Sequence, residues 1–236
     1  MTWPVTAVLD PLNRTENPLV GPGGSGWGAG YVTNNDGTGT FEDDGTTAIS
    51  TADGTWATAP WTKTDYSGDV ECYATLPTFA TAATACLLYA RITNPGGTSV
   101  LGYGAYFQTG GLTAGSQQCI IESLDASNTE NIQVTVSTLT FHDGDQLGIG
   151  VVGSINPVVT AYQNGTPIAT WTDSRGTPYT HGYIGMGTVK GVAGQGFSNF
   201  GGGNPFAATI QLLENEDGAH LILLENGQPL RLEQSL

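Results

Sequence analysis

Two carboxylates separated by one residue, Asp69 and Glu71, come closest to a catalytic motif in this sequence. Alternate residues of a β-strand point to the same face, so the pair would lie side by side on a sheet. Two carboxylates about 5 Å apart can serve as nucleophile and acid in glycoside hydrolysis. The next residue on that face is Tyr73, so a third carboxylate is missing. We therefore predict a solvated strand start here and not an active site.

Other catalytic patterns are equally incomplete. The histidines His142, His181 and His220 lie in turn-rich or C-terminal contexts, and no serine stands in a nucleophile elbow. The glycine-rich stretch 21–30 lacks the lysine and the following helix of a phosphate loop. The sequence therefore predicts that the protein is not an enzyme.

Aromatic side chains with polar neighbours are stronger candidates, because small-ligand sites combine aromatic surface with a few placed polar groups. Tyr89 and Arg91 would point from one face of the same strand, and Tyr103 opens the run that follows. The alternative is that the rings pack between sheets, where they bury large apolar areas. The predicted glycan contacts are Trp61, Tyr89, Arg91 and Tyr103. Further candidates are Trp56, Tyr66, Tyr106 and Trp171.

The balance of charge excludes several classes of partner. The 236 residues include 21 acidic and 6 basic side chains, which gives a formal charge of −15. Proteins that bind nucleic acid or anionic lipid need a cluster of lysine and arginine, which six scattered residues do not provide. We predict no nucleic-acid partner, and we interpret the acidity as a solvated surface.

The cysteines and the N-terminus bear on the compartment. Cys72, Cys86 and Cys119 each lie in an apolar strand-like run, which predicts small buried side chains and no zinc site. Residues 1–7 contain no basic region and no apolar core, so no signal peptide is expected. No apolar run approaches the roughly 18 residues of a membrane span, so membrane insertion is not expected either.

The fold class follows from turn residues and alternation. The chain contains 35 glycines and 12 prolines, and its strand-like runs show no helical period. In the run 86–92, positions 88, 90 and 92 would face one way and Tyr89 and Arg91 the other. Asn164-Gly165 predicts a type I′ hairpin between strands 158–163 and 168–172, with Pro167 at a strand start or on an unpaired edge.

These signals together predict an all-β protein, a two-sheet antiparallel jelly-roll sandwich. The predicted strands cover residues 5–10, 31–33, 38–42, 48–50, 54–57, 70–75, 86–93, 102–108, 118–123, 131–139, 146–152, 158–163, 168–172, 182–187 and 196–200.

A shift in composition at residues 201–205 divides the chain into a β-sandwich of residues 1–204 and a β-hairpin tail of residues 205–236. The tail repeats apolar strands separated by Glu, Asn and Gly, and about 32 residues of this kind are too few for a stable core. We expect its leucines to form an assembly interface, and the alternative is packing on their own domain. These residues are Leu212, Leu213, Leu221, Leu223, Leu224, Leu230 and Leu232.

Runs spread over residues 5–203 occur in an order that one family shares. Asp10-Pro11-Leu12-Asn13-Arg14, followed by Gly26-Trp27, resembles the D-x-F-N-R … W opening of that family. The later runs are Gly68–Leu76, Leu87–Asn94, Gly102-Tyr103, Asp143–Gly148, Val159–Gly165, Gly182–Gly185 and Phe197–Gly203. Together they resemble the concanavalin A-like (laminin-G-like) domains of bacteriophage structural proteins. The tail resembles the L-L-L-E-(N/D)-G repeats at the C-termini of phage tail and head proteins.

Two positions depart from the family pattern. Leu12 stands where an aromatic residue is usual, and Asn199 stands where the closing strand usually carries Asp. A calcium site built on Asp10 and that closing position would lose one charge. We therefore expect no cofactor, with Asp10 as the one candidate ligand for calcium.

The resemblance implies a bacteriophage virion protein assembled in the host cytoplasm, which suits the absence of a signal peptide. The leading interpretation is a minor tail or tail-tip component that binds host-surface carbohydrate. One alternative is a capsid decoration protein; another is a carbohydrate-binding module or a glycan hydrolase, since hydrolases of the laminarinase type share the fold. The expected partners are other virion proteins, further copies of this chain and host-surface glycans.

Overall fold

The protein was analysed as a computed structural model that describes residues 3–28, 41–51, 57–77, 84–97, 100–109, 117–126, 129–189, 196–205, 211–214, 220–223 and 229–230. The chain forms two compact units, Met1–Pro205 and Phe206–Leu236, whose boundary lies one residue after the predicted one. Among the described residues, no helix is long and apolar enough to cross a membrane.

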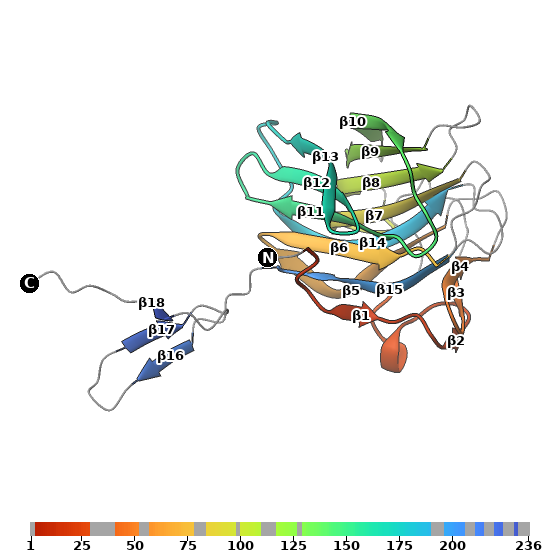
Figure 1. Ribbon diagram of the computed structural model, residues 1–236, viewed down its shortest axis with the longest axis horizontal. Coiled ribbons are helices and arrows are strands. Elements are labelled where there is room, and N and C mark those ends of the chain that lie inside the picture. Colours follow the sequence, from red (N-terminus) through yellow and green to blue (C-terminus); the bar gives the residue numbers. More distant parts are fainter. Residues whose placement is uncertain are drawn as a thin grey trace, which may run out of the picture. The chain divides into compact units, whose positions relative to one another are not determined.

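The first unit consists of two antiparallel sheets packed face to face (Figure 1). The nine-stranded sheet has the order β13 (Thr166–Thr172), β12 (Val158–Gln163), β11 (Gln146–Val152), β6 (Val70–Thr75), β15 (Gly196–Gly203), β4 (Ala48–Ser50), β3 (Phe41–Asp44) and β2 (Thr15–Glu16), with β1 (Val8–Asp10) also on β15. The six-stranded sheet has the order β10 (Glu130–Leu139), β9 (Gln117–Leu124), β8 (Leu101–Thr109), β7 (Thr84–Thr93), β14 (His181–Val189) and β5 (Ala57–Ser67). One 3-10 turn, η1 (Pro22–Gly24), lies between β2 and β3. The predicted all-β, two-sheet sandwich is confirmed.

The space between the sheets is filled by the apolar residues that alternate along the strands. Cys72 and Ala74 on β6 face Cys86 and Leu88 on β7, and all four side chains are fully buried. The three cysteines are free thiols inside the protein, as predicted. Burial raises the pKa of the Cys119 thiol to about 12, which keeps it protonated and unreactive at neutral pH.

Strand β5 (Ala57–Ser67) is the longest element that sequence reasoning missed, and the two-residue strand β2 was missed as well. The eleven residues of β5 include Pro60 and Lys63, which are unusual inside a strand. Both fit because β5 is the last strand of its sheet, with β14 on one side. Its other edge meets residues 26–28, where the carbonyl of Pro60 accepts from Gly28 N at 2.8 Å, so the absent N–H of Pro60 removes no bond to β14. The predicted strand segments at 31–33, 38–40 and 54–56 lie outside the described residues.

The predicted hairpin at Asn164-Gly165 is confirmed. Both residues have positive φ, 51° and 79°, and Gln163 pairs with Thr166 across the turn. Pro167 is the second residue of β13, which is the edge strand of its sheet, in agreement with the prediction.

A bulge at Arg91 corrects the alternation predicted for β7. Arg91 has φ 53°, and the pairing of β7 shifts register there with both β8 and β14. A bulge adds one residue to a strand and therefore reverses the faces beyond it. Ile92 consequently joins Leu87 and Tyr89 in a second buried cluster on the other face of the six-stranded sheet, instead of facing inward with Leu88.

The N-terminal segment crosses the outer face of the nine-stranded sheet. Trp3 stacks on Tyr162 with ring centroids 4.3 Å apart and 8° between the planes. Oε1 of Glu71 accepts hydrogen bonds from Val5 N, Thr6 N and Thr6 Oγ1 at 2.8, 2.7 and 2.6 Å. Glu71 is only 2% exposed, so the prediction of a solvated strand start is wrong for this residue. The segment covers the carboxylate and satisfies it.

The second unit is a three-stranded antiparallel sheet of β16 (Gln211–Glu214), β17 (His220–Leu223) and β18 (Pro229–Leu230), one strand more than the predicted hairpin. Leu213 pairs with Leu221. Leu212, Leu223 and Leu230 also lie on these strands, whereas Leu224 and Leu232 lie outside the described residues. The predicted assembly interface stays a prediction.

The packing of Trp3 against the sheet leads to a testable prediction for Gly148. A Cβ added at Gly148 would lie 1.7 Å from Cη2 of Trp3, so we expect Gly148→Ala to displace the indole and lower the free energy of unfolding by about 1–3 kcal/mol, as overpacking does. Gly176→Ala is the control, since nothing lies within 4 Å of a Cβ there. Urea unfolding measures both, and equal stability of the two variants would contradict this packing.

Candidate functional site

Three half-buried side chains gather where the edge strand β13 meets the following segment. They are Trp171 on β13 and Arg175 and Tyr179 on the connection to β14. The guanidinium of Arg175 lies 5.5 Å from the ring centroid of Trp171 and 4.8 Å from that of Tyr179. We call these three residues the end cluster. They lie at the end of β13, where the chain leaves the nine-stranded sheet and crosses to β14 in the six-stranded sheet.

A buried carboxylate holds Arg175 in place. Asp173 is fully buried, and its Oδ1 and Oδ2 accept hydrogen bonds from Nε and Nη2 of Arg175 at 2.8 and 2.6 Å. This fork-to-fork geometry fixes the plane of the guanidinium as well as its position. Arg175 Nη1 also donates to the hydroxyl of Tyr179 at 3.3 Å.

Two side chains from the six-stranded sheet position the end cluster from behind. The hydroxyl of Tyr103 donates to Asp173 at 2.7 Å and accepts from the backbone N–H of Tyr179 at 3.1 Å. Arg91 donates through Nη1 to the carbonyl of Tyr179 at 2.7 Å. Both polar backbone groups of Tyr179 are therefore fixed, and its own hydroxyl donates to the carbonyl of Leu124.

The fully buried guanidinium of Arg91 also binds two other connections. It donates to the carbonyl of Gly68, in the β5–β6 turn, at 2.6 Å through Nη2 and at 3.2 Å through Nε, and to the carbonyl of Gly153, in the β11–β12 loop, at 2.9 Å. Burial lowers the pKa of Arg91, which still remains protonated at neutral pH. The bulge described above is what turns this side chain to the loop end.

The charges of the end cluster are stable across the ordinary pH range. Burial works to raise the pKa of Asp173, but the hydrogen bonds from Arg175 and Tyr103 outweigh it and leave the pKa below its ordinary value. The same carboxylate raises the pKa of Arg175. Burial and the bond to Asp173 raise the pKa of Tyr103, so its hydroxyl remains a donor. The site therefore offers fixed donors and aromatic surface.

The structure corrects the glycan contacts predicted from the sequence. Trp61, Tyr89, Arg91 and Tyr103 are 3%, 0%, 0% and 0% exposed, so none presents a surface to a sugar. Trp61 packs inside the sandwich against Trp27, and Tyr89 lies in the cluster on the opposite face of the six-stranded sheet. Arg91 and Tyr103 do come together, as supports of the end cluster. The alternative of packing therefore holds for all four.

Sequence reasoning named Trp171 among its further candidates but missed its partners. The signal was present in the spacing, because Trp171, Asp173 and Arg175 alternate along the chain. An aromatic residue, a carboxylate and an arginine at every second position project to the same side of an extended chain. The support from Tyr103 and Arg91, 70 residues or more away, comes only from the fold.

The candidate calcium ligand is occupied by donors from the chain itself. Asp10 is fully buried and accepts hydrogen bonds from Leu12 N at 2.9 Å and from Trp27 Nε1 at 2.7 Å. Both terminal nitrogens of Arg14 also bind it, at 2.5 and 2.9 Å. Among the described residues no group of three His, Cys, Asp or Glu side chains is placed to hold a metal ion. Asp10 thus fastens the N-terminal segment.

The carboxylate pair considered for hydrolysis is engaged in the same way. Asp69 Oδ1 accepts from Gly153 N at 2.7 Å, while Glu71 binds the N-terminal segment. The nearby carboxylate Asp65 is exposed and pairs with His181 at 3.2 Å. The geometry therefore gives Asp69 and Glu71 structural partners and brings no third carboxylate to them within the chain that is described.

Comparison with known proteins identifies the fold. No family model and no curated protein matches the sequence. A carbohydrate-binding module, CBM66 from Bacillus subtilis, matches with TM-score 0.53 and 13% identity over 76% of this chain and 96% of its own. The exoplasmic/lumenal domain of VIP36 in its metal-free form matches with TM-score 0.54 and 12% identity over 92% and 96%. A Bacillus subtilis protein of unknown function with a galectin-like fold gives 0.54 and 12% over 75% and 89%.

The chain has a lectin-like jelly-roll fold. At these identities the similarity extends to the architecture, a concanavalin A-like type that carbohydrate-binding proteins use. The expectation of a concanavalin A-like sandwich is confirmed in this coarser form. The comparisons therefore establish the fold class of the sandwich. A function has to be argued from the residues of this chain, and the end cluster is the group of residues considered for it.

The pair of Asp173 and Arg175 gives a pH-dependent prediction. Because the folded-state pKa of Asp173 is lowered, its contribution to stability is present above the ordinary value of 3.8 and is lost as the pH falls through the folded value. We expect Asp173→Asn to cost about 1–2 kcal/mol at pH 7, a value discounted for the partial exposure of Arg175. The difference from the unmodified protein should shrink below pH 3.8.

Urea unfolding at several pH values measures this difference. Asp65→Asn is the control, because its pair with His181 is exposed and should matter less. If the difference in stability between Asp173→Asn and the unmodified protein stays the same from pH 7 to well below pH 3.8, the lowered pKa of Asp173 is contradicted.

Proposed function

We propose that the protein is a non-enzymatic carbohydrate-binding module whose glycan site is the end cluster. The observation that carries this proposal is the half-exposed surface of Trp171 and Tyr179 with the guanidinium of Arg175 held between them. Aromatic faces stack on the C–H face of a sugar ring, and a fixed guanidinium donates to its hydroxyl oxygens.

The unused donors of Arg175 support this assignment. A guanidinium has five N–H groups, and in Arg175 two serve Asp173 and one serves the Tyr179 hydroxyl. Within the described part of the chain, the remaining N–H groups on Nη1 and Nη2 meet no acceptor, so they can bind a ligand. Because Arg91 and Tyr103 fix the backbone of Tyr179, the cluster is arranged before the ligand arrives, which lowers the entropic cost of binding.

We further propose that the module belongs to a bacteriophage particle, as a minor tail or tail-tip protein that recognises host-surface glycans. The support is the order of sequence runs between residues 5 and 203 and the L-L-E-N-G repeats of the second unit. In this proposal the second unit assembles with other copies or other virion proteins. A capsid decoration protein would use the same two units on the head.

Trp171 is the residue on which glycan binding depends in this proposal. We expect Trp171→Ala to weaken binding at least about tenfold, which corresponds to roughly 1.4 kcal/mol, and Trp171→Phe to retain part of it. Ile132→Ala is the matched control, because Ile132 is 65% exposed on β10 and lies outside the end cluster.

Binding is measured on a glycan array of neutral and acidic oligosaccharides, followed by calorimetry with the best ligand. Melting temperatures of the variants separate a lost contact from lost folding. A ligand that binds the Trp171→Ala protein as tightly as the unmodified one would remove the end cluster as the site, and hydrolysis of a bound oligosaccharide would contradict the non-enzymatic part.

The role of the second unit is tested by substitution at paired positions. Leu213 and Leu221 face each other in the register of β16 and β17, so Leu213→Glu with Leu221→Glu introduces two like charges at one pair. We expect this variant to be lost from purified particles, while Gln211→Glu, on the same strand, remains. The measurement is the amount of chain that sediments with particles. Undiminished incorporation of the double variant would overturn the assembly role.

A further inference from the structure

The N-terminal segment, residues 3–7, crosses the outer face of the nine-stranded sheet before it joins that sheet. The first strand, β1, begins at Val8, so the segment precedes the first paired position. Trp3 lies over β11, Thr6 binds a side chain of β6, and the carbonyl of Ala7 lies over β15. The segment therefore runs across three strands, and hydrogen bonds from side chains of the sheet hold it.

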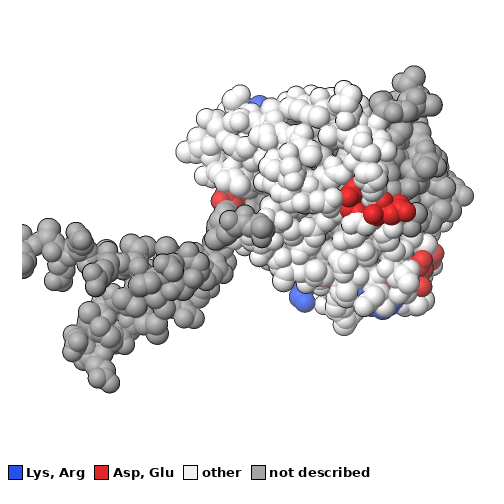
Figure 2. Space-filling model, viewed as in Figure 1, with Lys and Arg blue, Asp and Glu red and all other residues white. Residues whose placement is uncertain are grey.

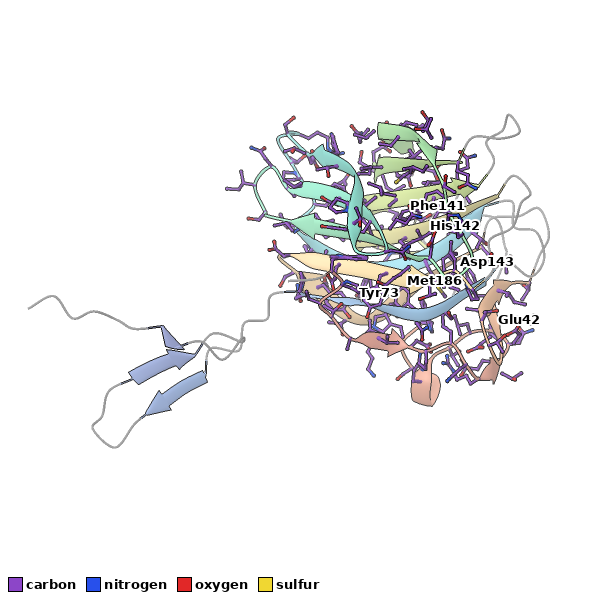
Figure 3. All side chains as sticks on the ribbon, in the orientation of Figure 1. Glu42, Tyr73, Phe141, His142, Asp143 and Met186 are labelled. Atoms are coloured by element: carbon purple, nitrogen blue, oxygen red, sulfur yellow. The ribbon has the colours of Figure 1, made fainter. Side chains whose placement is uncertain are left out.

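An aromatic slot receives Trp3. Its floor is formed by Gly148 and Gly150 on β11. Its walls are Tyr73 on β6, labelled in Figure 3, and Tyr162 on β12. The indole stacks on Tyr162 with ring centroids 4.3 Å apart, and it meets Tyr73 edge-on with ring centroids 6.0 Å apart. Two aromatic walls above a glycine floor suit a flat aromatic ring.

The sheet binds the main chain of the segment beside this slot. Oε1 of Glu71 accepts hydrogen bonds from Val5 N at 2.8 Å and from Thr6 N at 2.7 Å. The Tyr73 hydroxyl donates to the carbonyl of Thr6 at 2.8 Å. Main-chain groups are common to all peptides, so such bonds supply affinity and leave specificity to side chains. The specific groups here are the ring in the slot and the Thr6 hydroxyl, which donates to Glu71 at 2.6 Å.

Glycine also makes room for the segment on β15. A Cβ added at Gly201 would lie 2.8 Å from the carbonyl oxygen of Ala7. Glycine inside a strand commonly marks a place where other backbone approaches closely. The sheet is therefore shaped to let an extended chain cross it. We call the residues that receive this chain the cross-strand site, which consists of Glu71, Tyr73, Gly148, Gly150, Tyr162 and Gly201.

The surface around the cross-strand site is uncharged. Glu71 is 2% exposed beneath the segment, and in Figure 2 the surface over β6 and β11 is almost entirely white. Complementary charge is a common source of specificity between partners. Because little charge is exposed here, the ring and the main chain of a ligand have to provide the specificity, which suits an uncharged peptide.

The segment fits the cross-strand site imperfectly. Nε1 of Trp3 is buried and has no hydrogen-bond partner among the described residues. A donor that leaves water and finds no acceptor weakens the state in which it is buried. An aromatic ring of the same shape without an N–H group should therefore occupy the slot more tightly than tryptophan does. An external segment with such a ring can compete with residues 3–6.

We propose that the cross-strand site binds an extended, uncharged peptide segment with an aromatic residue three positions before a serine or threonine, and that residues 3–6 occupy it as an intramolecular ligand. A tethered ligand competes at an effective concentration in the millimolar range. An external segment therefore binds when it fits the slot better or when residues 3–6 are weakened. The site is separate from the end cluster and from the second unit, and it needs neither glycan binding nor particle assembly.

The test is the binding of a fluorescein-labelled peptide with the sequence of residues 2–8, Thr-Trp-Pro-Val-Thr-Ala-Val. Fluorescence polarisation follows its titration with the full chain up to about 1 mM. The full chain carrying Trp3→Ala and Thr6→Ala should bind it at least about tenfold more tightly than the unmodified chain, because its own segment has lost the ring and the hydroxyl. A peptide with alanine in place of tryptophan is the ligand control and should not bind.

A second peptide tests the fit of the ring. It carries 3-benzothienylalanine in place of tryptophan, so that sulfur replaces the indole N–H group. We expect this peptide to bind the double variant at least about threefold more tightly than the tryptophan peptide, because no donor is left without an acceptor.

Gly148→Ala, added to the double variant, locates the binding. The three atoms nearest to the added Cβ all belong to the ring of Trp3, so the melting temperature should stay the same once that ring is absent. The methyl group fills the slot, and peptide binding should fall at least about tenfold. Gly176→Ala is the matched control, since nothing lies within 4 Å of a Cβ there.

Three outcomes would overturn the proposal. They are a folded double variant that does not bind the tryptophan peptide, binding that Gly148→Ala leaves intact, and an unmodified chain that binds the peptide as tightly as the double variant. Trp3→Ala alone takes the place of the double variant if that variant does not fold. Equal or weaker binding of the benzothienylalanine peptide would contradict the imperfect fit of Trp3.

Discussion

A charged side chain without access to water sets the geometry of one end of this sandwich. The guanidinium of Arg91 is fully buried, and such a group is tolerated only when its N–H groups are hydrogen bonded. The acceptors are backbone carbonyls of Gly68, Tyr179 and Gly153, which come from three different connections. Two of these connections cross between the sheets, so satisfying one side chain fixes how the sheets are joined.

The end cluster is a consequence of that constraint. Arg91 fixes the carbonyl of Tyr179. The backbone N–H of Tyr179 then donates to the hydroxyl of Tyr103, which in turn donates to Asp173. Asp173 then orients Arg175 between two aromatic rings. The buried residues Arg91, Tyr103 and Asp173 make the site rigid. The partly exposed residues Trp171, Arg175 and Tyr179 are the ones that can contact a ligand. The outer face of β6, β11 and β12 works by the opposite principle, because Glu71, its one carboxylate, is covered by the N-terminal segment, whereas Val152 and Val158 remain exposed.

Much of the fold was predictable because it depends on local signals. β4, β6, β11 and β12 have the predicted bounds, since turn residues and alternation mark them directly. β5 was missed because Pro60 and Lys63 disguise an edge strand, and the reversal at Ile92 was missed because a bulge leaves no local mark. The site was harder to predict. An exposed aromatic and a buried one look alike in sequence, so Tyr89 and Tyr103 were assigned to the surface although both are buried. Burial depends on which face meets the other sheet.

The most direct test of the account is whether a glycan perturbs the end cluster itself. We would titrate the isotope-labelled full chain with the best array ligand and follow the Trp171 indole N–H and the Arg175 side-chain N–H by nuclear magnetic resonance. The account predicts that these two signals shift together and saturate with the same affinity, while the indole N–H of the buried Trp61 does not move. Saturable shifts confined to other residues, with both end-cluster signals unmoved, would contradict it.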